Sequence, residues 1–298
     1  MKMSNMLVST LREVPAEAEI DSHKLMLRAG MIRKMAAGIY NYMPIGLKVL
    51  KNIEEIVREE MNKINAEEVL MPSLINEDVY AESNRLSSFG DAMFKLKDRY
   101  DKNYVLGPTH EELFTIAAKN KVQSFKDLPF SIYQIQNKFR DEARPRYGLI
   151  RVREFLMKDA YSFDKDENGM IESYNKIRDT YFKTFNEIGL DIVAVAADNG
   201  SMGGKNSEEI MAISTIGEDT ILFDEETKQG LNVEVLEKDN AEEYLKENYG
   251  INDVKKLKEK KACELGHIFA LGTKYTESMN INFIDNENNS KPFYMGCY

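Results

Sequence analysis

The feature that most restricts the fold of this sequence is a pair of strand-like runs between residues 131 and 163, SIYQIQNKFR and LIRVREFLMKDAYSF. The segment between them, DEARPRYG, contains proline and glycine and therefore predicts a loop. Because side chains alternate along a strand, polar residues share one face of the first run: Gln134, Gln136, Lys138 and Arg140. One face of the second run carries Arg151, Arg153, Phe155 and Met157. We therefore expect a hairpin with a cationic face that includes an aromatic ring, although a solvated sheet face would share this pattern.

The remaining periodicity predicts separate runs of helices and strands. Apolar residues at spacings of three and four follow Pro44 and predict a helix, and residues 168–188 predict another. Strand-like patterns occur at 103–107 and return in LGHIFALGTKY, NINFI and KPFYMGCY. Without regular β-α alternation, this order favours an α+β fold with an antiparallel sheet flanked by helices. We expect residues 1–223 and 263–298 to form one domain, and residues 224–262, rich in Asp, Glu, Lys and Asn, to form a small helical insert.

Composition narrows the environment and the partners. Lysine and arginine number 40 against 50 aspartates and glutamates, so the formal charge is −10. Such a chain does not attract nucleic acid through its bulk charge, although a local basic patch can. No apolar run approaches the roughly 20 residues that cross a membrane, and the N-terminus lacks the apolar core of a signal peptide. Cys263 and Cys297 form no CxxC motif, which favours a reducing compartment and hence the cytoplasm. His23, His110 and His267 are far apart, so we expect no zinc site.

Four segments, in order and spacing, resemble prolyl-tRNA synthetases: RAGMIRKMAAGIYNYMPIG, VLGPTHEE, FRDEARPRYGLIRVREFLMKDAYSF and ELGHIFALGTKY. The resemblance covers nearly the whole chain and is weakest across residues 224–262. It implies a class II aminoacyl-tRNA synthetase, with a class II antiparallel sheet, that works as a homodimer. It also implies that the protein activates proline with ATP, which brings Mg²⁺ as part of the substrate complex, and transfers the proline to tRNA(Pro).

The resemblance assigns the ATP site to the predicted hairpin. Arg140 would contact the α-phosphate, where negative charge develops, and arginine suits this position because its planar fork grips phosphate oxygens and stays charged. Glu142 would hold the adenine amino group or brace the loop, and Phe155 would stack on adenine. Arg151 would help to hold the phosphates, whereas Arg153 would only support the site. From the residues alone, a surface ion pair at a strand end and a core phenylalanine are the alternatives.

The segment PTHEE resembles the amino-acid recognition loop of the family. Thr109 and Glu111 would accept the two N–H groups of the proline ammonium, although a helix start with Thr109 as N-cap fits the same residues. His110 is expected to be structural. His267 would line the proline pocket, but a lone histidine is equally compatible with a structural role. The glycine-rich turn at 200–204 lacks the spacing of a P-loop and would shape the amino-acid pocket.

The resemblance assigns a tRNA contact to the loop of the predicted hairpin. Arg144 and Arg146 would contact the acceptor end of tRNA, and the alternative is a solvated loop.

The sequence departs from the family in two places. Only about 40 residues occupy the place of the editing domain of many bacterial relatives, too few for a usual domain, so we expect no editing by this chain. The sequence ends at Tyr298, before the third class II motif, so we expect the isolated chain to activate proline poorly and to bind tRNA weakly.

Two other functions remain open on the sequence. The first is a non-catalytic, synthetase-like paralogue that binds proline or tRNA. The second is a class II synthetase for another amino acid, such as threonine or serine. The PTHEE loop and the lack of zinc ligands both count against this second alternative.

Overall fold

The computed structural model describes residues 2–204 and 206–298, which divide into two compact units. The first unit holds the described residues of 1–59, 70–110 and 134–158, and the second holds those of 60–69, 111–133 and 159–298. Two strands, β7 (Phe130–Phe139) and β8 (Glu154–Asp164), run along the chain from one unit into the other. Because each unit has its own core, we describe them separately.

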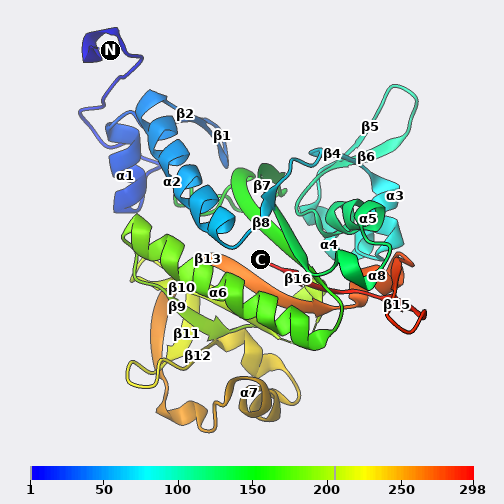
Figure 1. Cartoon of the computed structure of the whole chain (residues 1–298). Helices are drawn as coiled ribbons and strands as arrows, with labels where there is room; N and C mark the ends of the chain where they lie inside the picture. Colours follow the sequence, from blue (N-terminus) through cyan, green and yellow to red (C-terminus); the bar gives the residue numbers. More distant parts are fainter. Residues whose placement is uncertain (1, 205) are drawn as a thin grey trace. The chain divides into compact units, whose positions relative to one another are not determined.

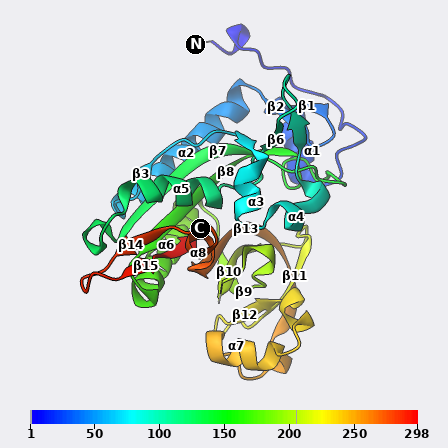
Figure 2. The same ribbon diagram turned by 90° about the vertical axis from the view of Figure 1, so that its right-hand side faces the viewer.

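The first unit begins with α1 (Asp21–Arg28), the antiparallel strands β1 (Ile32–Ala36) and β2 (Ile39–Tyr42), and the start of α2 (Pro44–Lys63). Figures 1 and 2 both show α1 beside this β1–β2 hairpin. Pro44 occupies the first position of α2, where its missing N–H leaves no intrahelical hydrogen bond unmade. The helix predicted after Pro44 is therefore confirmed.

A small antiparallel sheet completes the first unit, in the strand order β4-β6-β5. Its elements are β4 (Leu74–Asn76), β5 (Lys95–Lys97) and β6 (Asn103–Leu106), with α3 (Glu77–Glu82) and α4 (Leu86–Phe89) between β4 and β5. The strand predicted at 103–107 corresponds to β6. Val105 of β6 is completely buried, so this sheet contributes to the core of the unit.

The second unit is built on a nine-stranded sheet in the order β10-β9-β12-β11-β13-β16-β8-β7-β3. Its strands, besides β7 and β8, are β3 (Glu67–Glu68), β9 (Val193–Ala196), β10 (Ser207–Ile213), β11 (Asp219–Phe223), β12 (Gly230–Asn232), β13 (Lys258–Gly272) and β16 (Tyr294–Cys297). Among the pairings with a defined register, β12–β9 and β3–β7 are parallel and the others are antiparallel. The predicted α+β fold with an antiparallel sheet is confirmed.

The helix predicted over residues 168–188 is confirmed in the second unit. The helix α6 (Glu167–Ile188) packs on β13 and β16, as Figure 1 shows. It begins where the Asp166 side chain accepts a hydrogen bond from the Gly169 N–H, and it ends at Gly189, whose φ is +89°. The other elements are α5 (Glu111–Lys121), α7 (Ala241–Tyr249), α8 (Lys274–Ser278), β14 (Asn282–Ile284) and β15 (Ser290–Pro292).

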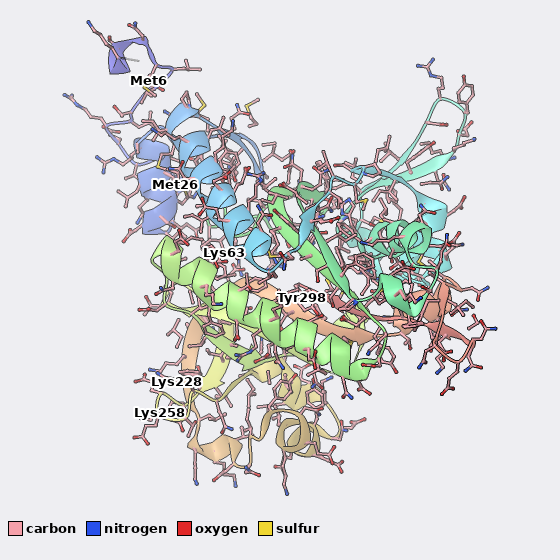
Figure 3. The ribbon with its side chains drawn as sticks, in the orientation of Figure 1. Met6, Met26, Lys63, Lys228, Lys258 and Tyr298 are labelled. Carbon is pink, nitrogen blue, oxygen red and sulfur yellow. The ribbon has the colours of Figure 1, made fainter. Side chains whose placement is uncertain are left out.

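Residues 224–262 form β12, α7, two short 3-10 helices and the start of β13. An apolar cluster joins Leu231, Val235, Leu245 and Ile251 to Ala196 of β9, and Figure 2 shows α7 beside β12. Lys228, between β11 and β12, and Lys258, at the start of β13, are both exposed (Figure 3). That residues 224–262 are a short insertion in place of an editing domain stays a prediction.

Two details of the predicted hairpin are wrong. The second strand was expected from residue 149, but β8 begins only at Glu154, because a turn over residues 147–150 and an isolated bridge between Arg146 and Arg151 precede it. Lys138, expected on an open cationic face, is completely buried. The open face is therefore formed by fewer cations than strand alternation predicts.

Across residues 2–204 and 206–298, no helix combines the length and the apolar character that a membrane crossing requires.

Candidate active site

Arg140 and Phe155 lie together in the first unit, as the sequence predicted. Arg140 follows the last residue of β7, and its backbone N–H donates to the Arg153 carbonyl at 2.9 Å. Its guanidinium carbon lies 5.3 Å from the centre of the Phe155 ring, within the range of a cation–π contact. Its Nη2 is 3.5 Å from the Pro108 carbonyl oxygen, at the limit of a hydrogen bond. Arg140 is exposed and Phe155 half-buried, so both side chains present polar and aromatic surface at the strand ends.

Glu142 and Arg151 form an ion pair across the loop that joins the two strands. Arg151 Nε lies 2.9 Å from Glu142 Oε2, and the Arg144 N–H donates to Glu142 Oε1 at 3.0 Å. The Arg144 N–H, followed by the Arg151 side chain, holds the pKa of the Glu142 carboxyl below its usual value. Glu142 therefore carries a full negative charge at neutral pH, and both of its oxygens bind groups of its own loop.

Arg144 and Arg146 project from this loop, and both are exposed. Reciprocal backbone hydrogen bonds of 3.0 and 3.3 Å join Arg146 to Arg151 and close the end of the loop. The Arg146 guanidinium carbon lies 5.1 Å from the centre of the Tyr147 ring. The loop thus exposes two cations near the Glu142–Arg151 pair, which is the local basic surface that an acidic chain needs to contact a polyanion.

Thr109 and His110 are buried in the first unit. The Thr109 carbonyl accepts a 2.6 Å hydrogen bond from the Tyr80 hydroxyl. His110 is completely buried, with Lys138 Nζ at 2.6 Å from its Nδ1 and the Pro72 carbonyl oxygen at 3.1 Å from its Nε2. Because an ammonium can only donate, Nδ1 is the acceptor and Nε2–H donates to Pro72. These bonds give His110 the structural role expected for it.

Glu111 opens α5 in the second unit and is completely buried. The Cys297 thiol of β16 donates to Glu111 Oε1 at 3.3 Å. A buried carboxylate needs hydrogen-bond donors to offset its lost hydration. Cys297 is thus a neighbour of a predicted proline ligand, and the sequence analysis assigned it no role.

His267 stands on β13 among two carboxylates and an aromatic ring. Its Nδ1 lies 3.8 Å from Glu209 Oε1 and 3.5 Å from Glu264 Oε1, and its ring stacks on Phe269 with centroids 3.9 Å apart. Its Nε2 is buried, and no hydrogen-bond partner for it lies in the part of the chain that the structure describes. The ligand atoms of His267, Glu209 and Glu264 all lie within 4.8 Å of one another, so this trio could hold a small cation.

Glu209 of β10 is a candidate site residue that the sequence analysis missed. It is directly opposite His267 in the β10–β13 ladder, and the Asn232 amide donates to its Oε2 at 2.8 Å. Burial raises the pKa of Glu209 to about 8. A strongly shifted carboxyl beside a histidine marks a candidate functional site. Its only sequence signal was its place after the glycine-rich turn, which says nothing about its partner across the sheet.

The glycine-rich turn at 200–204 packs within the second unit. Gly203 and Gly204 have φ values of +73° and +94°, and a Cβ on Gly204 would lie only 2.2 Å from the Ala270 carbonyl oxygen. Glycine is therefore required there. The predicted ATP residues all lie in the first unit. Of the predicted proline residues, Thr109 belongs to the first unit, whereas Glu111 and His267 belong to the second.

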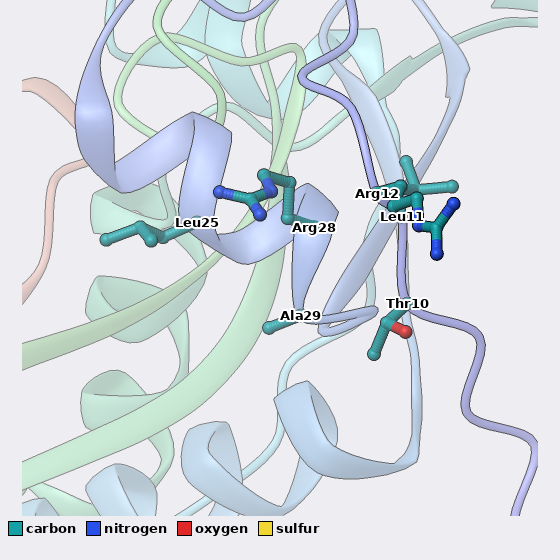
Figure 4. Close-up of a pocket in the computed structure, with 6 residues that line it drawn as sticks. All are labelled: Thr10, Leu11, Arg12, Leu25, Arg28 and Ala29. Carbon is teal, nitrogen blue, oxygen red and sulfur yellow. The ribbon is translucent and has the colours of Figure 1, made fainter.

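An open hollow of about 560 Å³ lies beside α1, lined by Thr10, Leu11, Arg12, Leu25, Arg28 and Ala29 (Figure 4). None of these is a predicted site residue. The candidate site is therefore identified by its side-chain chemistry, not by the depth of a cavity.

Comparison with known proteins agrees with this chemistry. The chain matches the family described as tRNA synthetase class II core domain (G, H, P, S and T) over residues 94–298. A proline–tRNA ligase of Ehrlichia canis (strain Jake) is 46% identical over 310 aligned residues, which cover 100% of this chain and 72% of that protein. A proline–tRNA ligase of Paraburkholderia xenovorans (strain LB400) is 52% identical over 237 residues, covering 80% of this chain and 41% of that protein.

Solved structures share the fold at lower identity. Giardia lamblia prolyl-tRNA synthetase in complex with prolyl-adenylate gives a TM-score of 0.71 at 18% identity, covering 90% of this chain and 47% of that one. Cryptosporidium parvum prolyl-tRNA synthetase complexed with L-proline and AMP gives a TM-score of 0.68 at 14% identity. The chain spans about half the length of these solved proteins.

Proposed function

Because this chain belongs to the proline–tRNA ligases, aminoacyl-tRNA synthetases with a class II core, we propose that it activates proline with ATP and transfers the prolyl group to tRNA(Pro). The observation that carries this proposal is the full-length match to a proline–tRNA ligase, together with the pairing of Arg140 and Phe155 that the site retains. The complexes of the solved relatives with prolyl-adenylate and with proline and AMP support the same reaction.

In the first step a carboxylate oxygen of proline attacks the α-phosphorus of ATP. The bond from that phosphorus to the bridging oxygen breaks, and pyrophosphate leaves with Mg²⁺, which we expect to arrive bound to ATP. Negative charge grows on the α-phosphate oxygens during this exchange, so a fixed cation lowers the barrier. Arg140 supplies that cation, and Phe155 supplies the aromatic surface on which adenine stacks.

Glu142 and Arg151 have a supporting role in this proposal. Two functions were open for Glu142, an adenine contact and bracing of the loop. Since its two oxygens already accept from Arg144 N–H and Arg151 Nε, we favour bracing. The brace fixes the direction of the Arg151 guanidinium, a group whose geometry suits phosphate oxygens.

Proline recognition involves Thr109, Glu111 and His267, as the family resemblance implies, and we add Glu209. The ammonium of proline has two N–H donors and a positive charge. A carboxyl kept neutral by burial ionises when a cation binds beside it, because the opposite charge stabilises its charged form. Glu209, with its pKa of about 8, has this property next to His267.

Transfer of the prolyl group requires the acceptor end of tRNA(Pro), and we assign its contact to Arg144 and Arg146. Both are exposed on the loop beside the ATP residues. Homodimer formation is a further proposal that rests on the family resemblance, and a cytoplasmic location is one that rests on the cysteine pattern and the N-terminal sequence.

Proline-dependent exchange of labelled pyrophosphate into ATP, followed by charging of tRNA(Pro), tests this function in the full-length gene product. We expect both reactions with proline. Binding of proline or tRNA without either reaction would instead identify a non-catalytic paralogue, and exchange that depends on threonine or serine would identify a different synthetase.

A further inference from the structure

The loop that carries the basic residues, residues 141–151 and here called the basic loop, has an unusual backbone. Tyr147 and Gly148 follow one another with φ values of +58° and +66°. Tyrosine rarely adopts this left-handed conformation, and such positions persist only where the surroundings enforce them. Contacts within the first unit must therefore hold the basic loop in this conformation.

The turn between β1 and β2 contacts the basic loop through Gly38. The Arg153 N–H, two residues after the loop, donates to the Gly38 carbonyl at 2.9 Å. A Cβ built on Gly38 would lie 2.8 Å from Pro145 Cβ and 2.9 Å from Arg153 N. Real Cβ atoms do not approach other atoms so closely, so only glycine lets this turn meet the loop.

The helix α1 contacts the loop through His23, which is buried. A Cβ on Gly148 would lie 2.9 Å from both Cγ and Cδ2 of the His23 ring. The ring also meets Tyr40 edge-on, with centroids 5.9 Å apart. Burial lowers the pKa of His23, so an uncharged ring fills the space beneath Gly148.

An apolar contact completes the attachment. Leu149, next to Gly148, packs against the buried cluster of Ala18, Leu27 and Ile32. These three contacts hold the backbone and the apolar side chains of the loop. Arg144 and Arg146 remain exposed, so the attachment fixes the loop while leaving its cations open to a ligand.

We propose that Gly38 and His23, here called the loop support, set the conformation of the basic loop and thereby the affinity of the enzyme for the acceptor end of tRNA, without touching the RNA. This inference rests on the proposed function. The physical reason is that a loop held in its bound conformation loses less conformational entropy when RNA binds. Gly38 and His23 are thus positioning residues for tRNA.

The test compares Gly38→Ala with Gly189→Ala. Both glycines have positive φ, +73° and +89°, so both variants carry the backbone strain of alanine there. No atom lies within 4 Å of a Cβ on Gly189, whereas a Cβ on Gly38 meets Pro145 and Arg153. We expect Gly38→Ala to raise the KM for tRNA about tenfold, with the KM for proline within about twofold of the parent, as a tenfold effect corresponds to about 1.4 kcal/mol. Gly189→Ala should leave both values unchanged.

The variant His23→Ala isolates the contact with helix α1. It removes the ring that lies against Gly148, so it should also raise the KM for tRNA and leave the KM for proline unchanged. A His23→Ala enzyme with the parental KM for tRNA, or a Gly38→Ala enzyme indistinguishable from Gly189→Ala, would overturn the inference.

Limited trypsin digestion measures how readily the basic loop is cleaved, without an activity assay. We expect faster cleavage after Arg146 in Gly38→Ala than in Gly189→Ala, because a released loop fits a protease more readily. Equal cleavage rates would argue against the loop support even if the protein charged no tRNA. Loss of charging by the parent enzyme would refute the proposed function instead.

Discussion

Replacing Arg140 with alanine should separate catalysis from stability. In the proposed reaction this side chain compensates the charge that develops at the α-phosphate, whereas Arg151 helps to hold the phosphates. Removing one such preorganised donor typically lowers the rate by roughly 100- to 1000-fold, or about 2.7–4 kcal/mol. We expect the proline-dependent exchange rate of Arg140→Ala to fall within this range.

The structure limits the accompanying loss of stability. Arg140 is exposed, its contact with Pro108 is long at 3.5 Å, and its guanidinium carbon is 5.3 Å from the centre of the Phe155 ring. An exposed cation–π contact contributes about 0.5–1 kcal/mol. Loss of this contact should therefore lower the free energy of unfolding by about 0.5–1 kcal/mol, far less than the activation free energy rises.

Arg146→Ala is the matched control, since Arg146 is also exposed and its guanidinium carbon lies 5.1 Å from the Tyr147 ring. Pyrophosphate exchange needs no tRNA, so this variant should retain the exchange rate of the parent within about threefold, less than the tenfold that corresponds to 1.4 kcal/mol. The measurements are exchange in the full-length gene product and urea unfolding of each variant. An Arg140→Ala enzyme with near-parental exchange, or one that loses exchange only because it unfolds, would refute the role assigned to Arg140.

The remaining predictions concern pH, salt and ATP. Burial raises the pKa of Glu209 to about 8, so the folded chain holds this proton more tightly than the unfolded chain does, and stability from this group is lost as the pH rises through about 8. The free energy of unfolding, measured with urea at several pH values, should fall less steeply between about pH 5 and 8 in Glu209→Gln than in the parent. An equal slope in the two proteins would contradict the raised pKa of Glu209. Arg144→Ala and Arg146→Ala should each lower the slope of log affinity for tRNA against log salt by about one, and a slope equal to that of the parent would remove the residue from the RNA contact. Phe155→Ala should raise the KM for ATP more than the KM for proline in steady-state exchange assays. A larger rise in the KM for proline would refute the stacking of adenine on Phe155.

The sequence predicted the elements that local patterns determine. The helix after Pro44 and the helix α6 could be predicted because the pattern of a helix is local in the sequence. Arg140 and Phe155 could be placed together because both strand runs are long enough for alternation to define their faces. The family resemblance then supplied roles that no periodicity could supply.

The parts that were missed depend on contacts between distant segments. The late start of β8 reflects the left-handed pair Tyr147 and Gly148, whose conformation is enforced by His23 more than a hundred residues away in the sequence. Lys138 is buried because His110 accepts its hydrogen bond, which strand alternation cannot predict. Glu209 acquires its shifted pKa from burial within the β10–β13 ladder. Such features require the folded structure.

We predict that this chain recognises proline as the amino acid to be activated. Calorimetry with non-hydrolysable prolyl-, threonyl- and seryl-adenylate analogues tests it most directly, because the ligand presents the amino acid and the adenosine together. We expect the prolyl analogue to bind at least about a hundredfold more tightly than the other two, a difference of about 2.7 kcal/mol, and Arg140→Ala to weaken that binding. Tighter binding of the threonyl or seryl analogue would contradict the account.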